Sequence, residues 1–156
     1  MIQFDENGNL IPYRAIQTTL DEVDEYLVKP FPLSSTRSEL FSQLTTCIEL
    51  LKIEVYAQFD VLLDGSFVTQ KQSPNDIDLV IFLEYSVCNK FENELRKFKD
   101  QRLFPSLDLY IERVYPINHP YFVRYQSDRA YWQDFFSCNR RGQFKGFLTL
   151  SFRDDS

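Results

Sequence analysis

The chain has 156 residues, of which 44% are hydrophobic and 26% are charged, and its 17 basic and 23 acidic side chains give a net charge of −6. This length predicts a single domain over residues 1–156 with a core of its own. A chain this acidic is a poor general binder of nucleic acid, because neutralisation of phosphates dominates that affinity. We therefore expect no binding to double-stranded DNA.

The cysteines and the apolar segments of the sequence indicate the cellular compartment in which the protein is expected. Cys47, Cys88 and Cys138 are far apart and include no C-x-x-C pair, so they predict neither a disulfide framework nor a zinc site. A reducing compartment fits this usage. No signal peptide is visible, and no apolar stretch approaches the roughly 18 residues of a transmembrane helix. We expect a cytoplasmic protein without membrane contact.

The N-terminal part of the chain is predicted to be an arm over about residues 1–30. Its first ten residues contain the turn signal Asn7-Gly8-Asn9 and are expected to be irregular. A short helix is expected over 18–28, with Thr18 or Thr19 as its N-cap. The clearest helix follows, beginning at Ser34, Ser35 or Thr36. Its core-facing residues are Leu40, Phe41, Leu44, Cys47, Ile48 and Leu51.

The middle of the chain alternates between extended and helical patterns. Strands are predicted over 54–63, 76–83 and 106–113, with a charged amphipathic helix over 90–99. Alternation along the second strand predicts that Ile77, Leu79, Ile81 and Leu83 face one way and that Asp76, Asp78, Val80 and Phe82 face the other. Along the third strand, Leu107, Leu109 and Ile111 are expected to face the core, opposite Asp108, Tyr110 and Glu112. Together the elements predict an α+β protein.

The C-terminal part is predicted as a helix over 125–136, a turn over 139–142 and a closing strand over 147–152. The helix carries the aromatic residues Tyr131, Trp132, Phe135 and Phe136. At helical spacing such residues are more often core, although they could also stack a base. The basic cluster of Asn139, Arg140, Arg141 and Lys145 could be a surface turn or could grip a phosphate. Arg14 and Arg37 could also reach phosphate, but nothing in the sequence favours this.

The stretch Leu62–Val80, LLDGSFVTQKQSPNDIDLV, has the most chemical content. Asp76 and Asp78 form an i, i+2 pair on one face of a strand, with Cα atoms roughly 6.5–7 Å apart. Two carboxylates so placed favour a hard divalent cation. Gly65-Ser66 predicts a turn at which the backbone can approach a phosphate.

This constellation resembles the active centre of the DNA polymerase β-type nucleotidyltransferases. The resemblance covers Asp64 to Asp108 at the level of motifs, and it implies a nucleotidyltransferase fold with a small mixed β-sheet flanked by helices. It implies that Asp76 and Asp78 are metal ligands and that Asp108 is the third ligand and the base. The implied cofactor is Mg²⁺ or Mn²⁺, because nucleotidyl transfer requires a divalent metal.

The same resemblance implies a nucleoside triphosphate as substrate. Gly65 and Ser66 match the residues that hold its terminal phosphates in this family, and Thr69 and Lys71 could add contacts. The chain departs from the usual pattern at Phe67 and Val68, where family members have small residues.

The whole chain is also similar to a bacterial group of small stand-alone nucleotidyltransferase-like proteins. The shared features are F-x-E-x-G-x-L in the arm, GSFVT-x-K-x-x-P-x-DID, and YW-x-x-FF…G-x-x-KG-x-L near the C-terminus. Minimal members of the superfamily often accompany toxin partners or defence islands. Some transfer adenylyl groups to protein tyrosines, and others add nucleotides to transfer RNA.

The resemblance therefore implies a magnesium-dependent enzyme that moves a nucleoside monophosphate, expected to be AMP from ATP, onto a protein or RNA hydroxyl. The acceptor would be a protein or a tRNA, including a cognate toxin or antitoxin, in a toxin–antitoxin or phage-defence context. The alternative is a non-catalytic, antitoxin-type protein that binds a partner with the same fold. A signalling cyclase remains a third possibility, although such enzymes normally have a larger acceptor lobe.

Overall fold

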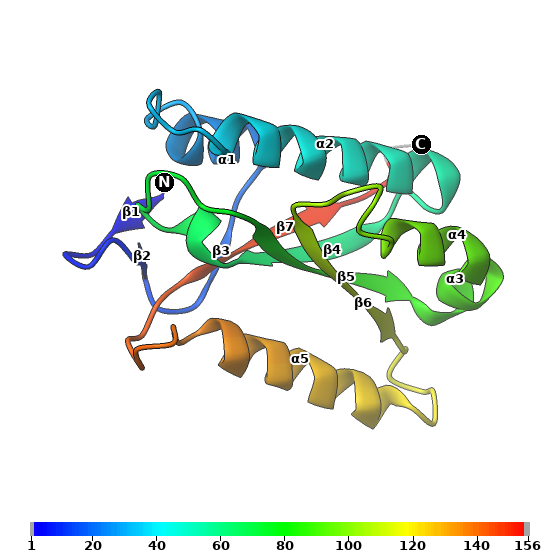
Figure 1. Cartoon of the computed structure of the whole chain (residues 1–156). Coiled ribbons are helices and arrows are strands. Elements are labelled where there is room, and N and C mark those ends of the chain that lie inside the picture. Colours follow the sequence, from blue (N-terminus) through cyan, green and yellow to red (C-terminus); the bar gives the residue numbers. More distant parts are fainter. Residues whose placement is uncertain (1, 155–156) are drawn as a thin grey trace.

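The protein has a mixed five-stranded sheet with helices on both faces, as seen in a computed structural model that describes residues 2–154 (Figure 1). In spatial order the strands are β3 (Ala15–Gln17), β7 (Phe147–Phe152), β4 (Phe59–Asp64), β5 (Ile77–Glu84) and β6 (Leu107–Val114). The pairs β3–β7 and β5–β6 are parallel, whereas β7–β4 and β4–β5 are antiparallel. The expected α+β class with a mixed sheet is confirmed.

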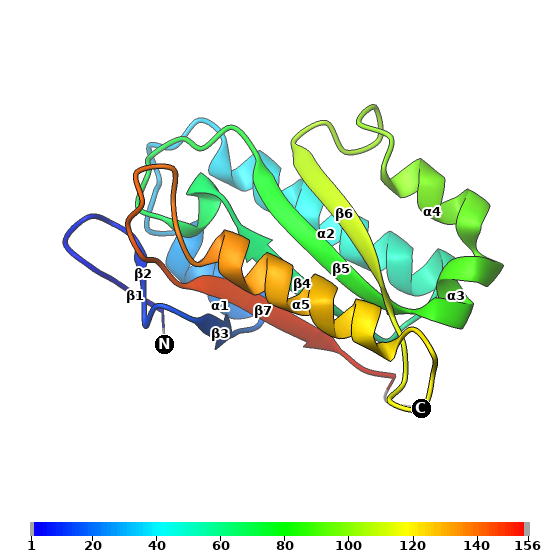
Figure 2. The ribbon, with the colours of Figure 1, turned by 90° about the horizontal axis from the view of Figure 1, so that it is seen from below.

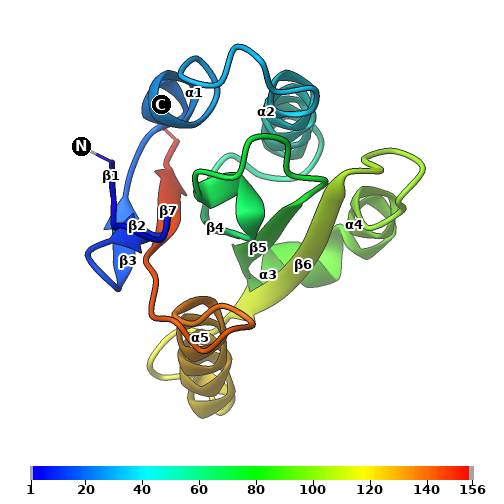
Figure 3. The ribbon, with the colours of Figure 1, turned by 60° about the vertical axis from the view of Figure 1, so that its left-hand side comes forward.

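The helices lie in two layers. The helices α1 (Leu20–Leu27), α2 (Arg37–Glu54), α3 (Tyr85–Lys90) and α4 (Glu92–Phe98) contribute buried residues to one core cluster. The single helix α5 (Phe122–Phe136) lies against the opposite face of the sheet (Figures 2 and 3). No helix within residues 2–154 has both the length and the apolar character needed to cross a bilayer.

Alternation along the central strand β5 divides the core into two parts. Its residues Ile77, Leu79, Ile81 and Leu83 belong to the large cluster under α1, α2 and α4. Its residues Val80 and Phe82 belong to a smaller cluster with Leu62, Trp132, Phe136 and Phe147 on the α5 face. The sides predicted for β5 are therefore confirmed, and Asp78 lies on the α5 face by the same alternation.

Local capping explains where the first two long helices begin. The Thr19 hydroxyl accepts a hydrogen bond from the Glu22 N–H (3.2 Å), which satisfies a free donor at the start of α1. The Ser34 hydroxyl accepts from the N–H groups of Thr36 (3.2 Å) and Arg37 (3.0 Å) before α2. Both expected helix starts are confirmed.

The boundaries of two elements differ from the sequence prediction. Residue 54 was expected to begin a strand, but α2 continues to Glu54 and ends where the N–H groups of Val55 and Tyr56 bond the Leu51 carbonyl. The β-branched residues at this end of the helix imitate a strand, because their propensity is weaker than the packing that holds the helix. The helix expected over 90–99 corresponds to α4. A separate helix that was not predicted, α3, precedes it, and the Glu84 carboxylate caps the first turn of α3.

The N-terminal arm contains regular secondary structure where an irregular segment was expected. The strands β1 (Gln3–Phe4) and β2 (Leu10–Ile11) form a small hairpin, and β3 joins the edge of the main sheet; residue 1 of the expected arm lies outside the described residues. Gly8 turns the hairpin with φ +80°, and its carbonyl accepts from the Gln70 N–H at 3.0 Å. The arm therefore contacts the loop that follows Gly65.

Candidate functional site

Three aspartates stand in one line across three neighbouring strands. Asp64 at the end of β4 pairs with Asp78 near the start of β5, and Asp78 pairs in turn with Asp108 near the start of β6. Directly paired residues project from the same face of a sheet. We call Asp64, Asp78 and Asp108 the carboxylate row. Sequence reasoning did not assign a role to Asp64; its signal was an acidic residue that ends a buried apolar strand directly before Gly65.

The carboxylates of the row repel one another. The pKa of Asp78 is raised to about 6, first by burial and then by the charges of Asp76 and Asp108. A hydrogen bond between the side chains of Asp78 and Asp108 also favours the protonated form of Asp78. Asp76, which lies just before β5, and Asp108 are both exposed. The structure thus brings together the three aspartates that the sequence singled out, in an arrangement where a cation would relieve the repulsion.

Asp64 is neutralised differently, by a buried ion pair with Lys145. The Lys145 ammonium donates a hydrogen bond to Asp64 Oδ1, and both side chains are buried. Burial raises the pKa of the Asp64 carboxyl, and the charge of Lys145 opposes this rise. Lys145 also lowers the pKa of Asp78 through its charge. Because Lys145 is buried in this pair, it is not part of an exposed basic cluster.

The rest of the expected basic cluster forms a surface turn. The Asn139 side-chain oxygen accepts from the N–H groups of Arg141 (2.9 Å) and Gln143 (3.0 Å), and Gly142 adopts φ +75°. Arg140 and Arg141 are exposed on this turn. Of the two interpretations, the structure favours the surface turn.

Gly65 makes the close approach between the turn and the carboxylate row possible. It adopts φ +88°, a conformation that other residues rarely adopt. A Cβ atom at this position would lie 3.1 Å from Asp78 Oδ2, so a side chain would press on the carboxylate. The short helix η1 (Ser66–Val68) follows the turn. Phe67 and Val68 are fully buried in the large core cluster, which explains why bulky residues follow the Gly-Ser pair.

Arg37 holds the other side of this loop. Its guanidinium makes five hydrogen bonds of 2.6–3.2 Å to the carbonyls of Leu27, Phe67, Thr69 and Lys71. It also lies over the Phe31 ring, 4.0 Å from the ring centroid. Arg37 is therefore committed to shaping the loop, so it is not free to bind a phosphate, which the sequence had left open.

The other residues expected to bind nucleotide lie in the same loop. The Thr69 hydroxyl donates to the Ser66 carbonyl (2.7 Å) and accepts from the Lys71 N–H (3.2 Å), so this hydroxyl closes the loop on itself. Ser66 is half-buried and Lys71 is exposed. Gly65 and Ser66 thus directly follow Asp64, the first residue of the carboxylate row, in the sequence. Thr69 has a structural contact that the sequence did not predict.

The donors fit a hard divalent cation by their chemistry. Within residues 2–154, no group of three or more His, Cys, Asp or Glu side chains is already arranged as a metal centre. Asp78 and Asp108 are nevertheless directly paired across β5 and β6, so a cation bound there would relieve the repulsion between their charges. Mg²⁺ needs only one or two protein carboxylates when waters and substrate phosphates complete its shell.

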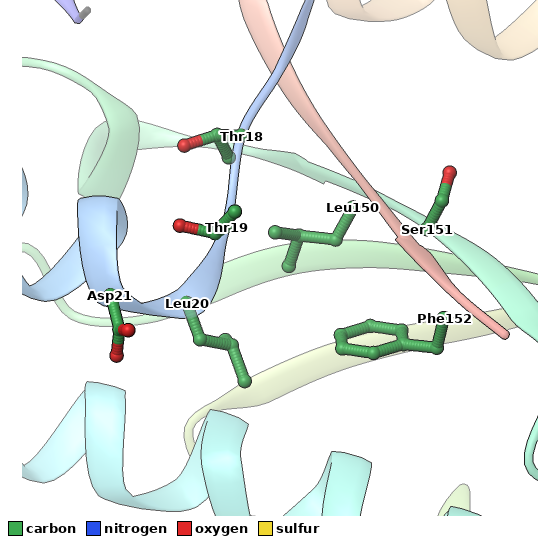
Figure 4. Close-up of a pocket in the computed structure, with 7 residues that line it drawn as sticks. All are labelled: Thr18, Thr19, Leu20, Asp21, Leu150, Ser151 and Phe152. Atoms are coloured by element: carbon green, nitrogen blue, oxygen red, sulfur yellow. The ribbon is translucent and has the colours of Figure 1, made fainter. Parts of the chain in front are cut away.

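The carboxylate row does not line either of two small cavities in the described part of the chain. One cavity of about 200 Å³ lies between the β3–α1 junction and β7 and is lined by Thr18–Asp21 and Leu150–Phe152 (Figure 4). The other, of about 210 Å³, lies between α3, α4 and β6. Both are smaller than the roughly 300–1,000 Å³ of typical ligand pockets. The candidate site is therefore defined by its charges and by the Gly65 turn.

The fold and the site define an α+β protein with an acidic centre beside a glycine turn. The chain belongs to a family of unknown function, DUF6932, whose family model matches residues 2–151. No curated protein and no solved structure matches the chain.

Proposed function

We propose that this chain is a nucleotidyltransferase with the DNA polymerase β-like fold. It would transfer a nucleoside monophosphate, AMP from ATP, to a hydroxyl of a protein or RNA with Mg²⁺ or Mn²⁺ as cofactor. The observation that carries the proposal is the alignment of Asp78 with Asp108 in adjacent strands, with Asp76 close by and Gly65 against Asp78. This arrangement supports a site that binds a metal and a phosphate together.

Each residue has a defined part in the proposed reaction. Asp76, Asp78 and Asp108 would hold the metal, which neutralises the triphosphate and aligns it for in-line displacement when bound. Asp108 is exposed and would accept the proton of the acceptor hydroxyl. The acceptor oxygen then bonds to the α-phosphorus as the bond to the leaving pyrophosphate breaks. Gly65 and Ser66 would lie along the phosphates, where the missing side chain of Gly65 leaves room.

The acceptor and the biological context follow from the resemblance. The arm pattern and the C-terminal pattern are those of small nucleotidyltransferase-like proteins that accompany toxins or defence islands. We therefore place this protein in a cytoplasmic toxin–antitoxin or phage-defence setting, with a protein or tRNA acceptor. A cognate toxin or antitoxin is the first acceptor to test.

The second candidate is a non-catalytic, antitoxin-type protein that binds a partner through the same fold. The observation that favours it is the exposure of Asp76 and Asp108, which leaves these two carboxylates accessible to a partner. Such a protein would keep its biological effect without the metal-binding aspartates.

One experiment separates the two candidates. The full chain is incubated with each α-labelled nucleoside triphosphate, Mg²⁺ and cell lysate, and the label in protein and in RNA is measured. The test variant is Asp76→Asn/Asp78→Asn, and the control is Asp134→Asn, which alters an exposed carboxylate on α5. We expect labelling by the wild type and the control but not by the folded double variant. Labelling or a biological effect that survives in the double variant would overturn the enzymatic proposal.

A further inference from the structure

Three exposed aromatic rings form a surface beside the carboxylate row. Tyr110 on β6 is 42% exposed, and Tyr131 and Phe135 on α5 are 56% and 58% exposed. Tyr131 and Phe135 are one helical turn apart, and their rings are nearly parallel, with an interplanar angle of 14° and centroids 6.0 Å apart. We call Tyr110, Tyr131 and Phe135 the aromatic platform. Large apolar groups that gather on a surface commonly mark a binding site.

The buried ring of Trp132 contacts all three rings of the aromatic platform. The centroid of the Trp132 ring lies 4.8 Å from Tyr110, 5.1 Å from Tyr131 and 5.9 Å from Phe135. Trp132 also packs on Phe136 in the core. The platform is therefore supported by a fixed ring, so that its shape is largely formed before any ligand binds.

The platform is continuous with the carboxylate row. Tyr110 follows Asp108 by two residues on the same face of β6, which places their Cα atoms roughly 6.5–7 Å apart. The Tyr110 ring in turn contacts Trp132, whose ring contacts Tyr131. A ligand that reaches from the row to Tyr131 therefore needs an anionic, metal-bound end and a flat, uncharged end.

A nucleoside triphosphate has this distribution of chemistry. Its phosphates need the metal that the row would hold, and its base is a flat aromatic group that stacks on exposed rings. The tyrosine hydroxyls of the platform could also bond the edge of a base. We propose that the aromatic platform binds the nucleobase of the nucleotide whose phosphates lie at the carboxylate row. This inference rests on the proposed function, and it assigns the base subsite to α5 and β6.

The test compares ligands with and without a base. Binding of ATP and of inorganic tripolyphosphate to the full chain is measured by calorimetry in the presence of Mg²⁺. The test variant is Tyr131→Ala/Phe135→Ala. The matched control, Ile53→Ala/Tyr56→Ala, removes two exposed apolar side chains at the end of α2 over the opposite face.

We expect the wild type and the control to bind ATP more tightly than tripolyphosphate. The platform variant should lose about tenfold in affinity for ATP and keep its affinity for tripolyphosphate, because only the base loses its stacking partners. An unchanged affinity of the folded variant for ATP would overturn the inference. So would equal affinities of the wild type for the two ligands.

Two further outcomes separate this inference from the proposed function. If the wild type binds tripolyphosphate but binds ATP no better, only the base subsite is wrong. If it binds neither ligand with Mg²⁺, the proposed function fails as well. A change of oligomeric state in the platform variant, measured by light scattering, would overturn the base subsite and identify the platform as a surface for self-association.

Discussion

Arg37 and Lys145 are two buried basic side chains that approach the same loop from different elements. Arg37, at the start of α2, is 1% exposed, and Lys145, before β7, is 5% exposed. The Arg37 guanidinium donates its hydrogen bonds to uncharged partners, namely four backbone carbonyls. Lys145 instead forms an ion pair with Asp64.

The difference shows that one residue can hold the conformation of the loop after Gly65 while another neutralises charge beside it. The planar guanidinium has several donors in a rigid fork, so it can hold carbonyls that point from different directions. Burial lowers the pKa of Arg37 to about 10, so it stays protonated near neutral pH. The ammonium of Lys145 acts as a point charge and lowers the pKa of Asp78 as well as neutralising Asp64. Arg37 therefore fixes the shape of the loop, and Lys145 offsets part of the negative charge of the carboxylate row.

The largest effect is expected from Arg37→Met, which leaves four carbonyls without their donor. We expect the free energy of unfolding to fall by about 3–5 kcal/mol, measured by urea denaturation. Arg37→Lys should lose nearly as much, because a lysine keeps the charge but not the fork. The control is Arg140→Met, on the exposed turn. A stability of Arg37→Lys close to that of the wild type would mean that charge, not geometry, holds the loop.

A smaller loss is expected from Lys145→Met, because Asp64 would stay buried without its partner. We expect the free energy of unfolding to fall by about 3 kcal/mol, measured by urea denaturation. Asp64→Asn and the double variant Asp64→Asn/Lys145→Met complete a double-mutant cycle. The double variant should lose less than the sum of the two single variants. Additive losses would show that the ion pair has no coupling energy.

The smallest effect on stability is expected from Glu112→Gln. Glu112 is a half-buried carboxylate near Asp128. Its pKa is raised, first by burial and then by the charge of Asp128. The folded protein therefore favours the protonated, neutral form of Glu112. Below the ordinary pKa of 4.5, Glu112 is neutral in both the folded and the unfolded chain and does not destabilise the fold. As the pH rises through the pKa of Glu112 in the folded protein, the carboxylate becomes charged and the protein loses stability.

Glu112→Gln should therefore gain stability over the wild type as the pH rises above about 4.5, by less than about 1 kcal/mol because the group is partly solvated. Melting curves at pH 4 and pH 7 measure the difference, with Asp134→Asn as the control. A constant difference between wild type and variant at the two pH values would contradict the assignment.

The periodic parts of the chain were predicted well, because their signal is local. The strand over 147–152 and the two faces of β5 follow from alternation alone. The end of α2 at Glu54 and the strand β3 were missed. In both cases packing against distant residues overrides a weak local preference, and β3 has too few residues to show a period of its own.

Sequence alone determined the parts of the candidate site that lie close together in the chain. The spacing of Asp76 and Asp78 keeps these two carboxylates close together, and Gly65 marks the turn, since both follow from local backbone geometry. In the structure Asp78 lies within β5, and Asp76 lies just before it. Tertiary structure alone decided that Asp64 aligns with Asp78, that Lys145 pairs with Asp64 across 81 residues, and that Tyr110 meets Trp132 of α5. The physical reason is that the register between strands, and the placement of a helix on a sheet, depend on how the whole core packs.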